Sequence, residues 1–321
     1  MKRARKSPAE SDKNSTEEFR SRELKSLEEG RILGNVQWLR KTLKEIFESS
    51  KKQLPKEKAK DQTNEGNCAE DTDIKTIKNL DFQWKNVSDA GVEVILDFEI
   101  PSLEHLNLNH NEITENGTKL LSENSNWPNL TELMLSFNKI GDEGATALAK
   151  NDSWKYLTEL NLCGNNIGVE GATALAKNIS WVNLKRLDLS ENGIGVEGVT
   201  ALIKNSTWVK LAKLNLSVNQ LGAEGAAMLA ENSSWTNLEE LDLRDNKLGK
   251  EGAKGLAKNN SWINLKTLNL VANDLGEKGA AELVKNTSWV NLATLVLHNN
   301  NIGIDGAKKL RRKWSTCVLN V

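Results

Sequence analysis

The chain has 321 residues, with 43 Lys and Arg against 44 Asp and Glu, and a formal net charge of −1. The charge is unevenly divided, because residues 1–60 carry 17 Lys and Arg against 10 Asp and Glu, whereas residues 61–321 carry 26 against 34. The acidic balance of the larger part argues against the clustered positive charge of a nucleic-acid-binding surface, so no nucleic-acid partner is expected.

The N-terminus is polar and lacks the features of a targeting segment. Residues 1–16 are predicted to be a disordered basic tail, and no apolar segment of the kind found in Sec signal peptides follows their basic residues. No run of about 18 apolar residues occurs, so no membrane-spanning helix is expected. Cys68, Cys163 and Cys317 lie far apart and fit neither a disulfide framework nor a metal site. We therefore expect a cytoplasmic protein without a metal or other cofactor, while secretion as an effector by another route stays open.

Residues 17–50 are predicted to form an amphipathic helical segment, and the charged residues 51–73 a polar linker. Five apolar residues share one face of this helix at spacings of three and four: Ile32, Val36, Leu39, Leu43 and Ile46. Its basic part, residues 31–52, has three alternative roles. It caps the first repeat, it contacts a partner or a second copy of the chain, or it lies on an anionic membrane, the role we favour least.

Residues 74–321 are predicted to be a repeat domain. Units of 27 residues begin, without insertion or deletion, at Trp127, Trp154, Trp181, Trp208, Trp235, Trp262 and Trp289. Degenerate copies precede them from about residue 77, and the chain ends in an atypical unit with a closing strand. A period of this length indicates a solenoid of about nine repeats whose end units act as caps.

Each repeat is predicted to contain one strand and one helix. In the copy that begins at Trp127, Leu133 and Leu135 alternate as in a strand and point inward, and Asn138 satisfies backbone groups after the strand. Gly141 provides a turn with positive φ, and Asn151 is interpreted as the C-cap of the following helix. Parallel strands stacked beside wider helices predict an α/β horseshoe with a concave sheet.

Two further recurring features are interpreted as structural. The tryptophans, at a constant interval, are predicted to close the core where the chain returns from helix to strand. The Asn-x-Ser/Thr sites resemble glycosylation sequons, but we interpret them as one structural position copied six times, at Asn151, Asn178, Asn205, Asn232, Asn259 and Asn286.

The segment LTELNLCGNNIGVEGATALAKN and its copies resemble the leucine-rich repeat family, and IGxEGAxALAxN resembles its ribonuclease-inhibitor-like class. The resemblance covers about residues 77–310 and implies the solenoid fold. Ribonuclease inhibitors are rich in cysteine and alternate two repeat lengths, and this chain does neither, so binding of a ribonuclease is not implied. The family also includes Ran GTPase-activating proteins, but the Arg and the acidic C-terminal features associated with that activity cannot be mapped onto this chain.

No catalytic constellation occurs in the sequence, so we expect a non-catalytic scaffold that binds a protein partner through its concave face and rim. Phe137, in a rim loop, is either an anchor for the partner or packs under a neighbouring loop. A regulator of a small GTPase and a bacterial effector or immune-type sensor fragment stay open as alternatives. The outward strand positions and the rim supply the candidate contact residues: Glu132, Met134, Phe137, Glu159, Asn161, Arg186, Asp188, Lys213, Asn215, Glu240, Asp242, Arg244, Asn269 and His298.

Overall fold

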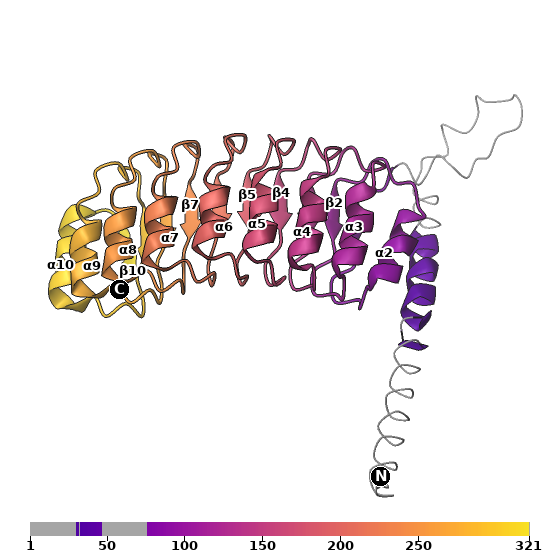
Figure 1. Cartoon of the computed structure of the whole chain (residues 1–321), viewed down its shortest axis with the longest axis horizontal. Coiled ribbons are helices and arrows are strands. Elements are labelled where there is room, and N and C mark those ends of the chain that lie inside the picture. Colours follow the sequence, from indigo (N-terminus) through magenta and orange to yellow (C-terminus); the bar gives the residue numbers. More distant parts are fainter. Residues whose placement is uncertain (1–29, 32, 47–75, 321) are drawn as a thin grey trace, which may run out of the picture.

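The computed structural model describes residues 30–31, 33–46 and 76–320. The predicted tail at 1–16 and linker at 51–73 lie outside the described residues, as does the first part of the predicted helical segment. Figure 1 shows an elongated array in which helices stack along one face of a long sheet.

The described residues contain ten short strands, which alternate with helices. The strands are β1 (Asn79–Asp81), β2 (His105–Asn107), β3 (Glu132–Met134), β4 (Glu159–Asn161), β5 (Arg186–Asp188), β6 (Lys213–Asn215), β7 (Glu240–Asp242), β8 (Thr267–Asn269), β9 (Thr294–Val296) and β10 (Val318–Asn320). The helices between them are α2 (Asp89–Leu96), α3 (Glu115–Glu123), α4 (Gly141–Ala149), α5 (Val169–Ala176), α6 (Gly195–Leu202), α7 (Gly222–Leu229), α8 (Gly249–Leu256), α9 (Gly276–Leu283) and α10 (Gly303–Lys313).

The strands form one parallel sheet in chain order from β1 to β10. Equivalent residues of neighbouring repeats pair with one another, as Glu159 does with Arg186 and Leu160 with Leu187. Because the interval between the good copies is constant, each strand joins the sheet without a change of register. The α/β solenoid predicted from the repeat is confirmed.

The core is built from the same side chains in every repeat. The middle residue of each strand from β2 to β9 is a leucine with at most 3% of its surface exposed, and the seven repeat-opening tryptophans are 0–1% exposed. The predicted core role of these tryptophans is confirmed. Their buried indole N–H groups have no hydrogen-bond partner among the described residues, so these rings stabilise the fold through packing.

A ladder of buried asparagines supports the turn after each strand. Asn246 donates from Nδ2 to the carbonyl oxygens of Leu216 (2.8 Å) and Leu243 (3.0 Å). Its Oδ1 accepts the backbone N–H of Asn219 at 2.9 Å. One side chain therefore ties its own turn to the turn of the preceding repeat, as predicted for Asn138 and its copies.

The predicted C-cap role of Asn151 is wrong. Helix α4 ends at Ala149, and Lys150 occupies the C-cap position. The Oδ1 of Asn151 instead accepts the backbone N–H groups of Ser153 and Trp154, and its Nδ2 donates to the carbonyl oxygen of Ser122 in the preceding repeat. The side chain points forward because the turn into the next strand has free N–H groups to satisfy.

The Asn-x-Ser/Thr pattern follows from this second ladder. Asn178 is 5% exposed, and the single proton of the Ser180 hydroxyl is shared between two acceptors at 3.1 Å, Asn178 Oδ1 and the carbonyl oxygen of Asn151. The pattern is therefore a structural position, as predicted.

Residues 30–31 and 33–46 form a helix beside α2, at the end of the array (Figure 1). Leu39 and Leu43 are 2% and 0% exposed and belong to the same hydrophobic core as the repeats. Arg31 pairs with Glu112 at 2.6 Å, and Arg40 pairs with Asp97 at 3.1 Å. The hydrogen bond from Arg31 holds the pKa of Glu112 below its usual range. In the described residues this helix thus covers the first repeat.

The other end of the core is covered differently. The ring of Trp314 stacks on Trp289 at a centroid distance of 6.2 Å, and β10 pairs with β9. The closing strand expected from the atypical last unit is present at Val318–Asn320.

Candidate functional site

The outer face of the sheet displays two rows of side chains. Each strand from β1 to β9 has three residues, of which the middle one is buried while the first and third point away from the core. We call the outward residues the first-position row and the third-position row. The predicted contact residues in the first-position row are Glu132, Glu159, Arg186, Lys213 and Glu240, and those in the third-position row are Met134, Asn161, Asp188, Asn215, Asp242 and Asn269.

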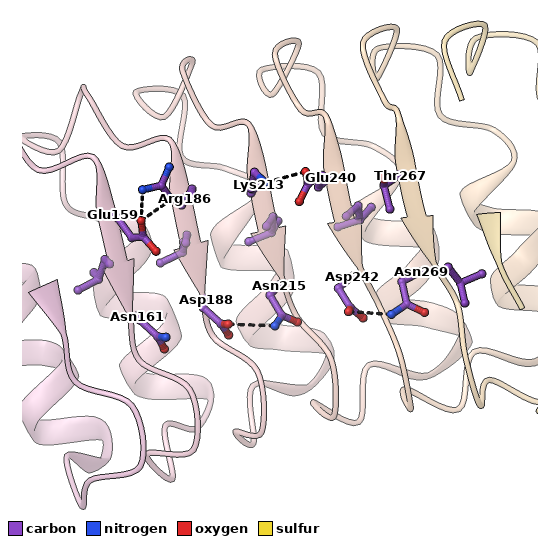
Figure 2. A pocket seen from close by; sticks show the side chains of 15 residues that line it. Glu159, Asn161, Arg186, Asp188, Lys213, Asn215, Glu240, Asp242, Thr267 and Asn269 are labelled. Atoms are coloured by element: carbon purple, nitrogen blue, oxygen red, sulfur yellow. Dashed lines mark hydrogen bonds and ion pairs between the residues drawn. The ribbon is translucent and has the colours of Figure 1, made fainter. Parts of the chain in front are cut away.

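A hollow of about 330 Å³ lies in the middle of this face, over β4 to β9 (Figure 2). Thr267 and Val296, which were not among the predicted contact residues, also line it. Both are outward strand positions, which their alternation with the buried leucines indicates. The hollow brings together nine predicted residues: Glu159, Asn161, Arg186, Asp188, Lys213, Asn215, Glu240, Asp242 and Asn269. Five others lie outside it: Glu132, Met134, Phe137, Arg244 and His298.

Charges in the first-position row neutralise one another across neighbouring strands. Arg186 forms a hydrogen-bonded ion pair with Glu159 and lies 3.5 Å from Glu132, while Lys213 pairs with Glu240 at 2.6 Å. The hydrogen bond to Glu159 raises the pKa of the Arg186 guanidinium. Since these pairs are partly exposed, each contributes at most about 1 kcal/mol to stability.

The third-position row has a structural role that the sequence analysis missed. The Oδ1 of Asp188 accepts the backbone N–H of Ser190 at 2.9 Å, and Oδ1 of Asp242 accepts that of Arg244 at 2.9 Å. This contact closes a turn directly after the strand and requires Asn or Asp. The same contact recurs at Asp81, Asn107, Asn161, Asn215 and Asn269. The recurrence of Asn or Asp at this position was the available signal, and it shows that the row is less freely variable than expected.

Three aromatic rings form a stack on the rim beyond β1, β2 and β3. The ring centroids of Trp84 and His110 are 3.8 Å apart with planes at 10°, and those of His110 and Phe137 are 4.5 Å apart with planes at 12°. Phe137 also covers Gly164, where an added Cβ would lie 2.7 Å from the ring. With Phe137 40% exposed and Trp84 66% exposed, the stack is packed against its own turns and open to a partner.

The stack occupies a conformation that aromatic residues rarely adopt. Trp84, His110 and Phe137 have φ of 60°, 54° and 53°, in the left-handed region, where a residue other than glycine costs about 1–3 kcal/mol. Later repeats have Glu191 and Val218 at the same position, so the scaffold does not require an aromatic there. Trp84 was assigned no role from the sequence, although Trp84, His110 and Phe137 follow one another at intervals of 26 and 27 residues.

Burial raises the pKa of the Cys163 thiol to about 11, so this group is protonated at neutral pH. Within residues 30–31, 33–46 and 76–320, no cluster of His, Cys, Asp and Glu side chains is arranged to hold a metal ion. None of the helices in these ranges combines the length and apolarity needed to cross a bilayer.

Comparison with known protein families agrees with this geometry. The family model described as Leucine Rich repeat matches seven segments, which are residues 99–122, 128–149, 155–176, 182–202, 210–230, 236–257 and 263–284. The chain is a leucine-rich repeat protein. The match is to leucine-rich repeats in general, and it does not distinguish the ribonuclease-inhibitor-like class.

Two solved bacterial structures are among those similar to it. A leucine-rich repeat protein of Leptospira interrogans is 24% identical over 77% of this chain and 61% of that chain, with a TM-score of 0.45. InlP of Listeria monocytogenes is 17% identical over 70% of this chain and 56% of that chain, with a TM-score of 0.49. The chain thus spans less than two thirds of either length. A search of curated proteins found no match.

Proposed function

We propose that this leucine-rich repeat protein is a non-catalytic scaffold that binds a protein partner on the outer face of its sheet. The observation that carries the proposal is the hollow over β4 to β9, in which the first-position side chains differ from repeat to repeat above leucines that do not. A fixed scaffold with a changing outer row is what an extended recognition surface requires.

The dimensions and charges of the surface support a protein as the partner. Nine steps between ten strands, at about 4.8 Å each, give a face about 43 Å long, which exceeds the reach of a small molecule. Both signs of charge occur in the hollow, for example at Arg186 and Asp188. The rim stack of Trp84, His110 and Phe137 adds exposed aromatic surface, which interface hot spots favour.

The N-terminal helix has two roles in this proposal, as a cap of the scaffold and as an additional contact for the partner. Its buried Leu39 and Leu43 cover the end of the core, while Leu33 and Trp38, at 59% and 41% exposed, supply a second contact area.

Cys163 and Cys317 are both free thiols, which supports a reducing compartment such as the cytoplasm.

A charge-reversal variant of the hollow tests the proposal. We expect Arg186→Glu, Lys213→Glu and Glu240→Lys together to abolish crosslinking of the partner that the wild-type chain captures. A matched control places Lys177→Glu, Lys204→Glu and Glu224→Lys on the helical side, after α5, after α6 and in α7, with the same net change of charge. Both variants should keep the circular dichroism of the wild type. Retention of the partner by the hollow variant, or its equal loss in the control, would contradict the proposal.

A further inference from the structure

The cations of the hollow are already paired within the protein. Arg186 binds the carboxylates of Glu159 and Glu132, and Lys213 binds that of Glu240. In contrast, neither Asp188 nor Asp242 has an ion pair within 4.0 Å among the described residues. The uncompensated negative charge of the hollow therefore lies in the third-position row.

The two carboxylates are held in place by neutral groups. Asp188 Oδ2 accepts from Asn215 Nδ2 at 3.0 Å, and Asp242 Oδ2 accepts from Asn269 Nδ2 at 2.8 Å. Their Oδ1 atoms accept backbone N–H groups. Both side chains are thus fixed without loss of charge, and Figure 2 shows them in one row on either side of Asn215.

The spacing of these carboxylates limits what can pair with both. Asp188 is on β5 and Asp242 is on β7, so two strand steps of about 4.8 Å place them about 10 Å apart. In a polyproline II segment, residues i and i+3 lie on one face about 9 Å apart. In a β-strand, same-face neighbours are about 7 Å or about 13 Å apart, which fits less well.

We propose that the partner carries a cationic segment that crosses the strands along the third-position row and places two basic side chains, about 10 Å apart, on Asp188 and Asp242. This inference rests on the proposed function and specifies the chemistry of the partner. An extended segment with Arg or Lys at i and i+3 in a polyproline II conformation meets the requirement. The negative charge excludes an acidic segment from the same position.

Rigid proline-rich peptides provide the test, because the polyproline II helix fixes the distance between two Arg residues placed in it. Two fluorescein-labelled peptides contain two Arg at i, i+3 (about 9 Å) or at i, i+6 (about 19 Å) in a run of prolines. Their binding to the full chain is measured by fluorescence polarisation at low salt. We expect the shorter spacing to bind more tightly, and Asp188→Asn and Asp242→Asn to weaken that binding by about fivefold each, as expected for partly exposed ion pairs.

The structure supplies controls that preserve the fold. Asn161, Asn215 and Asn269 make the same Oδ1 contact with the backbone in neighbouring repeats, so asparagine at either Asp position retains the turn, while it gives up the oxygen that accepts from the neighbouring asparagine Nδ2. The double variant Asn161→Asp, Asp242→Asn keeps two carboxylates in the row but reduces their spacing to about 5 Å. We expect it to lose the preference for the i, i+3 peptide although the net charge is unchanged.

Equal binding of both peptides to the wild type, unchanged binding to Asp188→Asn and Asp242→Asn, or wild-type behaviour of the spacing variant would each overturn the inference. Its failure is separable from that of the proposed function. If the charge-reversal variant loses the partner while the variant with both Asp→Asn changes retains it, the sheet face binds the partner without the two-cation contact. If both variants retain the partner, the proposed function itself is wrong.

Discussion

Replacing Asn246 by alanine should destabilise the solenoid strongly, because this side chain serves four buried backbone groups. Its Oδ1 accepts from the N–H of Asn219 and Leu221, at 2.9 and 3.3 Å. Its Nδ2 donates to the carbonyl oxygens of Leu216 and Leu243, at 2.8 and 3.0 Å. An unsatisfied buried group costs about 1–3 kcal/mol, so the two orphaned N–H groups alone predict a loss of about 2–6 kcal/mol.

Urea unfolding followed by circular dichroism measures this loss, with Asn237→Ala as the matched control. Asn237 also donates to a carbonyl oxygen of the preceding repeat, that of Val209 at 2.7 Å, but it is exposed. Since water replaces that contact, the control should lose no more than about 1 kcal/mol. Equal losses in Asn246→Ala and Asn237→Ala would refute the assignment of stability to the buried ladder.

Two further predictions concern the rim and the N-terminal helix. The double variant Trp84→Asn, Phe137→Asn should leave the stability unchanged or raise it. Asn tolerates positive φ, as Asn299 does at the same position (φ 58°), and the relieved strain offsets the lost stacking of about 0.5–1.5 kcal/mol per pair. A fall of more than about 1 kcal/mol in the free energy of thermal unfolding would show instead that the stack stabilises the fold. Because Arg31 lowers the pKa of Glu112 in the folded chain, the stability from this pair is present above the unfolded pKa and is lost as pH falls through the folded pKa. Wild type should therefore exceed Glu112→Gln by up to about 1 kcal/mol at pH 7 and match it near pH 2 in thermal unfolding, and a constant difference would contradict this sign.

The parts of the structure that could be predicted are those in which one side chain serves every repeat. The tryptophans, the inward leucines and Asn138 with its copies recur at fixed intervals, and recurrence reveals a shared packing or hydrogen-bonding task. Asn151 also recurs, but the interval does not show which backbone groups its side chain binds. Asparagine suits both a helix C-cap and a side chain that hydrogen-bonds to the preceding repeat. The position of the residue was therefore predictable and its contact was not.

The surface was harder to predict because its contacts join different side chains. Whether Arg186 turns toward Glu159 or toward a residue of the next strand depends on rotamers and local geometry, which the spacing of residues does not encode. The aromatic stack requires that three successive repeats, which differ in sequence, each place a ring at the same repeat position. In the next repeat this position is Gly164, which leaves space for the ring of Phe137. Its members become related only when the repeats are stacked.

The buried tryptophans give each central repeat its own optical reporter. Seven indoles occupy equivalent dry sites, one per repeat, so their emission should be alike in wavelength and should shift to the red when a repeat opens to water. Unravelling from one end would then lower the short-wavelength signal in steps, whereas concerted unfolding would remove it at once. The short-wavelength part of the emission spectrum therefore reports on these folded repeats without a label, above the longer-wavelength emission of the exposed Trp38 and Trp84.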